Sequence, residues 1–217
     1  PAHRAKANVT ELFALALDLD HGVTLAADLT TWRKSSYIYG AHTTHSHKRV
    51  TDSNPNAEER FRVVLPLASP IPAIYYPALW QWANHKCGGK LDPATKDQSR
   101  MLYWPSKSSA DSEYYHEVHD GRLLDWRELP PLQYVVSAFE GEMSALLSAA
   151  DGGRNNQLFK SAAALGELVA GGFLDHDRLV AALEEAACKI GLDVDLDCGP
   201  QGIAATLQSG LRTGLKN

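Results

Sequence analysis

The stretches LFALALDLD (residues 12–20) and RFRVVLPL (residues 60–67) decide the fold class that the sequence predicts. The first is an apolar run that ends in two acids separated by one residue, which is typical of a buried strand with carboxylates at its C-terminal end. The second is rich in β-branched and large apolar residues and is the clearest strand of the chain. We therefore expect a fold built on a sheet, with carboxylates at the end of its first strand.

The segments around these two strands alternate in type. Aromatic and β-branched runs predict further strands, and apolar residues at helical spacing predict two amphipathic helices. The expected elements are strands at 36–44 and 101–105, helices at 24–33 and 73–86, a loop at 45–59 and an extended piece at 90–93. This order predicts the α+β class with a mixed or antiparallel sheet.

The composition changes near Pro130-Pro131, and the rest of the chain is rich in alanine, leucine and glycine. Apolar residues recur at helical spacing, with a polar break at 151–156. The expected helices cover 132–149, 156–170, 175–190 and 200–215. We expect an α+β domain at 1–130, a connecting helix and linker at 131–153, and a small all-α helical domain at 154–217.

The overall composition is that of an ordinary globular chain. Of the 217 residues, 44% are hydrophobic and 22% are charged, and no stretch approaches the roughly 18 consecutive apolar residues of a membrane span. Polar residues interrupt the N-terminal segment, so no secretory signal peptide is expected, and the three cysteines form no CxxC pair. A net charge of −5 argues against a protein that coats DNA through bulk electrostatics. We expect a protein of a reducing cytoplasm with no membrane partner.

Asp18 and Asp20 lie two residues apart on a predicted strand, so their side chains point to the same face. Two buried carboxylates repel each other unless a cation lies between them, and carboxylate oxygens are the ligands that magnesium and manganese prefer. Removing either carboxylate is then expected to leave the metal-free stability unchanged or raised. The alternative is a solvent-exposed pair at the turn before His21-Gly22, because Asp-x-Asp is a common string.

A third acid strengthens the metal hypothesis. Asp92 ends a short extended segment, and Asp97 follows in the same stretch. Three carboxylates from separate segments would suit a two-metal site for in-line phosphoryl transfer. Local sequence leaves Asp92 and Asp97 as open alternatives, and a surface turn is possible for either.

The chain also carries cationic side chains that could bind a phosphate group. Arg60 and Arg62 alternate on the clearest strand and share a face, which is costly unless they meet an anion or lie at a solvated edge. Residues 33–62 carry a local excess of positive charge in a net-negative protein. Three histidines are close enough in sequence to bind zinc, but no fourth ligand is evident. They are His42, His45 and His47.

Four stretches together resemble one known family, the primase-polymerases of the archaeo-eukaryotic primase superfamily, in particular the phage and plasmid forms of actinobacteria. LALDLD resembles the first motif, THSHKR with ERFRVVLPLASPI the second, and KLDPATKDQSRMLYWPS the third, in which a metal-binding aspartate precedes an arginine by eight residues. The C-terminal segments are similar to the helical domain that follows the catalytic domain in such proteins. These stretches are residues 15–20, 44–71, 90–106 and 153–215.

The resemblance implies a template-dependent nucleotidyltransferase that synthesises primers or extends DNA in phage or plasmid replication. It implies a catalytic domain at 1–130, with Asp18, Asp20 and Asp92 as catalytic residues and as ligands of two Mg²⁺ or Mn²⁺ ions. The expected partners are a single-stranded DNA template, NTP or dNTP substrates and a replicative helicase module. The expected location is the cytoplasm of a bacterial host cell.

The chain departs from the family at the second motif. Relatives usually have Ser-x-His on this strand, whereas the equivalent stretch here is Arg60-Phe61-Arg62, or Ser46-His47 supplies the histidine from the loop before it. The expected nucleotide-binding residues are Arg60, Arg62, Arg100, Ser46, His47 and Lys48. The expected nucleic-acid-binding residues of the helical domain are Arg154, Lys160 and Arg212.

Two other classes of function compete with this interpretation. A rolling-circle or relaxase-type endonuclease would use a histidine pair such as His45 and His47 with a nucleophilic tyrosine from Tyr75-Tyr76. A non-enzymatic replication module would leave the aspartate pair and the arginine pair without a purpose. Metal-dependent synthesis from nucleotides distinguishes the first interpretation from both.

Overall fold

The computed structural model describes residues 5–103, 105–195 and 198–216. The chain divides into two compact units, which we describe separately. The first comprises Pro1–Ala73 and Leu79–Trp126, and the second comprises Ile74–Ala78 and Arg127–Asn217. None of the helices in the described part of the chain has the length and apolar character that a membrane span requires.

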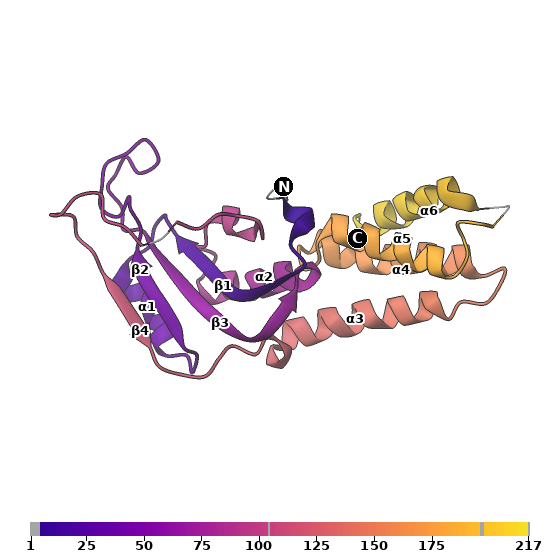
Figure 1. Cartoon of the computed structure of the whole chain (residues 1–217), viewed down its shortest axis with the longest axis horizontal. Helices are drawn as coiled ribbons and strands as arrows, with labels where there is room; N and C mark the ends of the chain where they lie inside the picture. The colour runs from indigo at the N-terminus through magenta and orange to yellow at the C-terminus, as the bar shows by residue number, and fades with distance from the viewer. Residues whose placement is uncertain (1–4, 104, 196–197, 217) are drawn as a thin grey trace. The chain divides into compact units, whose positions relative to one another are not determined.

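The first unit contains a four-stranded sheet in the order β1-β3-β2-β4, and every neighbouring pair is antiparallel (Figure 1). This confirms the predicted α+β class and makes the sheet antiparallel. Helix α1 begins at the side chain of Thr24, which accepts a hydrogen bond from the backbone N–H of Ala27. The elements of this part are β1 (Glu11–Leu19), α1 (Leu25–Arg33), β2 (Tyr39–Thr43), β3 (Phe61–Pro72), α2 (Tyr76–Lys86) and β4 (His116–His119). Short 3₁₀ turns lie at Lys6–Asn8, Ala73–Tyr75, Pro93–Lys96 and Trp126–Glu128.

The two faces of the sheet carry different side chains, because successive residues of a strand point to opposite sides. One face is the core of the unit and is filled by large apolar side chains. Among those with no exposed surface are Leu15, Leu17, Leu19, Val63, Leu65, Trp32 of α1 and Leu79 of α2. On the other face the pairing places Asp18 opposite Arg62, Arg62 opposite His42, and His42 opposite His116. These four polar residues therefore form one row across all four strands.

Two local predictions are wrong. Strand β3 does not end at 67 but continues to Pro72. Beyond Val64 it leaves β2 and pairs with β1, and its other side forms an isolated bridge, between Leu67 and Leu124. A side without a continuous partner strand tolerates proline, which has no N–H to donate. The expected strand at 101–105 does not form in its described residues, and Trp104 lies outside them. The fourth strand is β4, which the sequence did not reveal because HEVH lacks a run of apolar residues.

The other predicted strands and helices of this unit form near their predicted positions. Strands at 12–20 and 36–44 and helices at 24–33 and 73–86 are confirmed with shifted ends. The expected extended piece at 90–93 leads directly into a 3₁₀ turn at Pro93–Lys96.

Glu117 of β4 is the centre of a polar group that ties α1 to the sheet. Its carboxylate accepts hydrogen bonds from Arg33 Nη2 at 2.7 Å and from the hydroxyls of Tyr39 and Tyr115. The Arg33 hydrogen bond, followed by those of the tyrosines, lowers the pKa of Glu117 to about 2 despite its partial burial.

Replacing Glu117 by glutamine is expected to lower the free energy of unfolding at pH 7 by about 1–3 kcal/mol. The pKa of Glu117 is depressed in the folded state, so its stabilisation is present above the unfolded value near 4.5 and is lost as pH falls toward 2. Urea unfolding should therefore show a clearly smaller difference between the variant and the wild type at pH 3 than at pH 7. Glu113→Gln, at an exposed acid, is the control and should change little. An equal difference at both values of pH would contradict the prediction.

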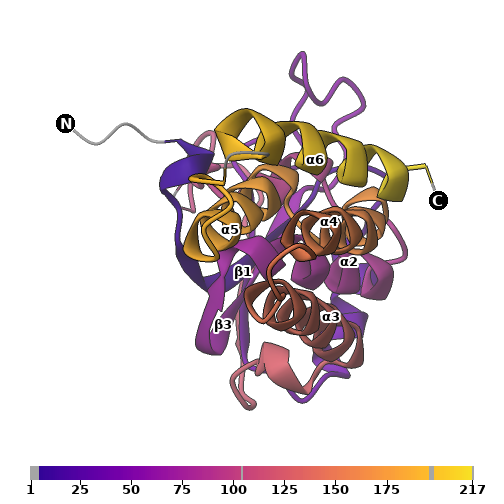
Figure 2. The same cartoon turned by 90° about the vertical axis from the view of Figure 1, so that its right-hand side faces the viewer.

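The second unit is helical. Figure 2 shows its four long helices packed side by side. Gly210 and Gly214 of α6 allow a close crossing with α4, because a Cβ at either position would lie under 3.0 Å from the α4 backbone carbonyl of Phe159 or Ala163. The helices are α3 (Pro130–Leu147), α4 (Arg154–Ala170), α5 (His176–Lys189) and α6 (Gly199–Gly214), which confirms the four predicted helices. Helix α3 belongs to the same compact unit as α4 to α6.

Candidate active site

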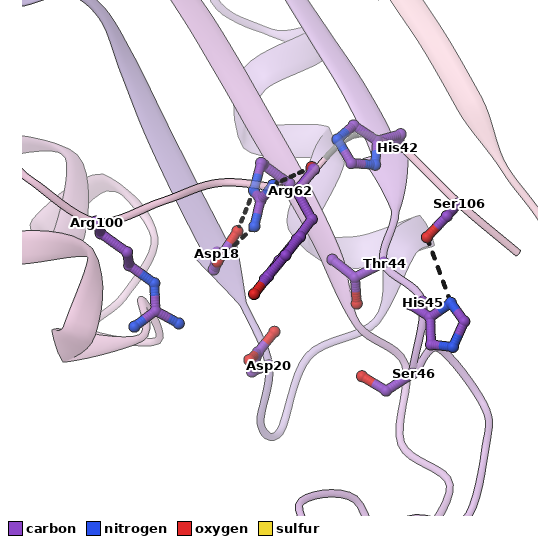
Figure 3. A pocket seen from close by; sticks show the side chains of 10 residues that line it. Asp18, Asp20, His42, Thr44, His45, Ser46, Arg62, Arg100 and Ser106 are labelled. Atoms are coloured by element: carbon purple, nitrogen blue, oxygen red, sulfur yellow. Dashed lines mark hydrogen bonds and ion pairs between the residues drawn. The ribbon is translucent and has the colours of Figure 1, made fainter. Parts of the chain in front are cut away.

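A cavity of about 470 Å³ lies on the polar face of the sheet, where β1 and β2 end and β3 begins (Figure 3). It is formed by the sheet, the loop after β2 and the segment that precedes β4. The lining residues are Asp18, Asp20, His42, Thr44, His45, Ser46, Arg62, Arg100, Tyr103 and Ser106.

Asp18 and Arg62 form a buried ion pair at the floor of this cavity. Arg62 Nε lies 2.5 Å from Asp18 Oδ1, and Arg62 Nη2 lies 2.9 Å from Asp18 Oδ2. A third guanidinium nitrogen donates to the carbonyl of Tyr103 at 3.0 Å. The two residues are only 4% and 8% exposed, so each charge depends on the other for compensation.

Among the described residues, Asp20 has no ion-pair partner as close as that of Asp18. Its carboxylate lies 3.9 Å from Arg60 Nη1, and 22% of its side chain is exposed. Burial raises the pKa of Asp20, and the carboxylates of Asp18 and Asp92 raise it further, while Arg60 opposes them. The negative charge at the end of β1 is therefore only partly neutralised by the protein.

Asp92 belongs to the same acidic group. Its backbone N–H donates to the carbonyl of Asp18 at 2.9 Å, which fastens this segment to the end of β1. Its carboxylate accepts from the N–H of Ala94 at 2.9 Å and from Arg100 Nη2 at 3.3 Å. Asp97, in contrast, is exposed and accepts from the N–H and hydroxyl of Ser99. Geometry thus favours Asp92 as the third acid.

Two arginines hold two of these three acids. Within the described residues, no three acid, histidine or cysteine side chains form a ready-made metal-binding group. The donor chemistry nevertheless suits a hard divalent cation, because the charges of Asp18 and Asp92 act on Asp20 and raise its pKa. For such a cation to bind, Arg62 must release Asp18, and Arg100 must release Asp92.

The expected nucleotide-binding residues separate into two groups. Arg62, Arg100 and Ser46 line the cavity. Arg60 does not, since its buried guanidinium donates to the backbone and hydroxyl of Ser53, while its Nε has no hydrogen-bond partner in the part of the chain that is described. Arg60 therefore fixes the loop behind the cavity and partly compensates Asp20.

His47 and Lys48 also lie outside this cavity. The buried His47 ring accepts a hydrogen bond from the N–H of Arg60 at 2.9 Å, and burial lowers the pKa of His47. Lys48 Nζ contacts Glu113 at 2.7 Å and Glu59 at 3.4 Å and borders a separate cavity. Both side chains thus connect the loop to the rest of the unit. Neither lines the cavity that contains Asp18 and Asp20.

Five residues that line the cavity were not among the expected catalytic or nucleotide-binding residues. His42 lies opposite Arg62 in the neighbouring strand, and this position is known only once the pairing of the strands is known. His45 Nδ1 lies 3.3 Å from Ser106 Oγ, and this contact joins two loops that are far apart in sequence. The sequence marked His42 and His45 only as possible zinc ligands, and His45 as part of a histidine pair. No pattern marked the other three lining residues, which are Thr44, Tyr103 and Ser106.

The three expected cations of the helical unit differ in their surroundings. Arg154 donates to the carbonyl of Ile190 at the end of α5 and pairs with Asp151 at 2.7 Å, so it serves the internal packing of the unit. Lys160 is exposed on α4. Arg212 borders a groove between α5 and α6.

The antiparallel sheet, its strand-end carboxylates and the arginines beside them define an α+β protein with an acidic site on an open sheet face. The model of the family described as VapE N-terminal domain matches residues 2–131, which is more than half of the chain. The chain belongs to the VapE N-terminal domain family, and the matched residues include the whole cavity lining. A comparison with curated proteins gave no match, and a comparison with solved structures gave none.

Proposed function

We propose that this chain is the nucleotidyl-transfer core of a primase-polymerase that joins nucleotides on a single-stranded DNA template. The observation that carries the proposal is a cavity lined by Asp18, Asp20, Arg62 and Arg100. Asp92 is hydrogen-bonded through its backbone to Asp18, and its charge acts on Asp20. Membership of a family tied to phage and plasmid replication proteins supports it.

The three aspartates are the residues that would hold two Mg²⁺ or Mn²⁺ ions. When bound, the ions would supply activation of the attacking hydroxyl and stabilisation of the pyrophosphate leaving group. Asp20 offers the least compensated carboxylate for this purpose, because its pKa is raised by burial and by the two neighbouring acids.

Arg62 and Arg100 have a double role in this proposal. Without substrate they neutralise Asp18 and Asp92. A triphosphate offers more negative charge and several oxygen acceptors to the same guanidinium groups. When the arginines turn to the phosphates, the acids are released for the cations. The cavity volume of about 470 Å³ is within the range of small-molecule sites and suits one nucleotide.

The endonuclease alternative is less well supported by the geometry. Of its histidine pair, His45 borders the cavity, whereas the ring of His47 is buried against the Arg60 backbone. Tyr75 and Tyr76 are 7% and 4% exposed, and burial raises the pKa of Tyr75 to about 12. A buried tyrosine is a poor nucleophile for DNA.

We assign the helical unit to a role in starting synthesis. Priming from two free nucleotides requires both to be held on the template, and an additional binding surface reduces the entropic cost. Lys160 and Arg212 remain candidate phosphate contacts, while Arg154 is engaged inside the unit. A helicase module would act together with this chain.

Incubation with single-stranded template, labelled nucleotides and either Mg²⁺ or Mn²⁺ tests the proposal, and Asp92 and Asp97 provide a matched pair. We expect Asp92→Asn to reduce incorporation by about 100-fold or more, because it removes a carboxylate of the acidic group. Asp97→Asn should retain most of the activity, since Asp97 is exposed and its carboxylate accepts hydrogen bonds from Ser99 of the same turn. Equal activity of the two variants would contradict the assignment of Asp92. Absence of incorporation by the unaltered chain would contradict the proposed function.

A further inference from the structure

A second row of residues lies next to the polar row, on the same face of the sheet. The pairing places Ala16 opposite Val64, Val64 opposite Gly40, and Gly40 opposite Val118. Each is two residues along its strand from Asp18, Arg62, His42 or His116, so the two rows share a face and lie about 7 Å apart. The second row consists only of small apolar residues.

This part of the sheet face is open. Val118 is 75% exposed, His116 is exposed, and Ala16, Gly40 and Val64 are partly exposed. A Cβ built on Gly40 would meet no atom within 4 Å. The strands are seen in Figure 3 with Asp18, Arg62 and His42 projecting from this side.

One aromatic ring borders the open face at β4, and another lies at the cavity. The ring of Tyr114 lies 5.6 Å from that of His116, and 39% of Tyr114 is exposed. Tyr103, which contacts Arg62 through its carbonyl, is 75% exposed at the cavity. The row of small apolar residues thus has the Tyr114 ring beside it at His116, and it lies next to the polar row that leads to the acidic site.

We propose that this surface, which we name the base platform, binds the unpaired bases of the single-stranded template. The inference rests on the proposed function, which makes a nucleic acid strand the second substrate of the neighbouring site. The platform consists of Ala16, Gly40, Val64, Tyr114, His116 and Val118.

Three properties favour bases as the occupant. Small side chains leave room for planar rings to lie over the strands, and the π-faces of bases stack on aromatic side chains without regard to sequence. The platform residues include no lysine or arginine, so the contacts are to bases and not to phosphates. The row of Asp18, Arg62, His42 and His116 continues from the cavity to the platform edge, which places a template base next to the bound nucleotide.

Gly40→Leu is the sharpest test of the base platform. The side chain has space at this position, so the sheet should fold normally, but it would project into the volume proposed for the bases. Gly141→Leu on α3 is the matched control, because a Cβ at Gly141 also meets no atom within 4 Å. The probe is a fluorescently labelled 12-nucleotide single-stranded DNA, with its duplex form as a second arm, followed by anisotropy without metal ions or nucleotides.

We expect the wild type to bind the single strand more tightly than the duplex. Gly40→Leu should weaken binding of the single strand by about tenfold, and Tyr114→Ala by a smaller factor, whereas Gly141→Leu should bind like the wild type. Affinity should fall only slightly between low and moderate salt, because few phosphate charges are neutralised.

Several results would overturn the base platform. These are no single-strand binding by the wild type at about 100 µM protein, unchanged binding by Gly40→Leu, or a preference for the duplex. Loss of self-association in Gly40→Leu, measured by light scattering, would assign the face to a second copy of the chain instead. Because binding is measured without metal or nucleotide, failure of the platform is distinguishable from failure of nucleotide incorporation.

Discussion

Replacing Asp20 by asparagine is expected to reduce nucleotide incorporation on the order of 1,000-fold while the protein remains folded. Asp20 is the acid with the least compensation by the protein, and its substitution removes a carboxylate that two cations would share. The measurement is single-turnover incorporation of a labelled nucleotide with Mn²⁺.

The stability of Asp20→Asn gives a second and independent readout. Burial and the neighbouring acids raise the pKa of Asp20 in the folded protein, so ionisation of this group opposes folding. The wild type therefore loses stability as pH rises from the unfolded value of 3.8 through the raised pKa, and the asparagine variant does not. At pH 7 without metal, the melting temperature of the variant should equal or exceed that of the wild type. Added Mn²⁺ should raise the melting temperature of the wild type only.

Asp18 must be treated differently from Asp20. Sequence reasoning expected that removal of either acid would leave the metal-free stability unchanged or raised. The bidentate pair restricts this expectation to Asp20, because Asp18→Asn would leave the buried Arg62 charge uncompensated. Normal incorporation by folded Asp20→Asn, or a melting temperature well below that of the wild type, would refute the assignment of this residue.

Replacing Arg62 by methionine is expected to lower the free energy of unfolding by about 3–5 kcal/mol, because it leaves the carboxylate of Asp18 buried and unpaired. In the proposed function a divalent cation takes the place of Arg62 at the Asp18 carboxylate, which leads to a further prediction. Mn²⁺ should restore much of the lost stability in Arg62→Met, since it replaces the missing positive charge. Urea unfolding with and without Mn²⁺ measures both effects.

Two controls separate the ion pair from general damage to the sheet. The double variant Asp18→Asn with Arg62→Met should be more stable than Arg62→Met alone, because neither charge is then buried without a partner. Lys48→Met removes a cation whose ion pairs are largely exposed and should change stability little. A double variant as unstable as Arg62→Met would show that the loss comes from packing and not from charge.

The apolar runs and the two spaced acids of the sequence were sufficient to predict much of the fold. Leu15, Leu17 and Leu19 have no exposed surface, and alternation along a strand then places Asp18 on the opposite face. The helices of the second unit were predicted from apolar spacing, which local periodicity determines. The α+β class followed from the order of these segments.

Strand β4 and the arginine pairs depended on contacts distant in sequence. HEVH is polar on both sides of one valine, and it forms a strand because β2 offers it a partner. From the sequence, Arg60 and Arg62 were expected to share one face of the strand and both to bind the nucleotide. In the tertiary structure the register sets Arg62 against Asp18, whereas Arg60 turns to Ser53 in a neighbouring loop.

The sequence by itself therefore determined the apolar core of β1, most of the regular segments and which acids lie at a strand end, because those properties follow from local periodicity and solvation. Only the tertiary structure decided that the Asp92 segment is hydrogen-bonded to the end of β1, and that His42 lies opposite Arg62. These choices depend on hydrogen bonds between segments more than 15 residues apart, such as Asp92 N–H to the Asp18 carbonyl, and no local pattern encodes them.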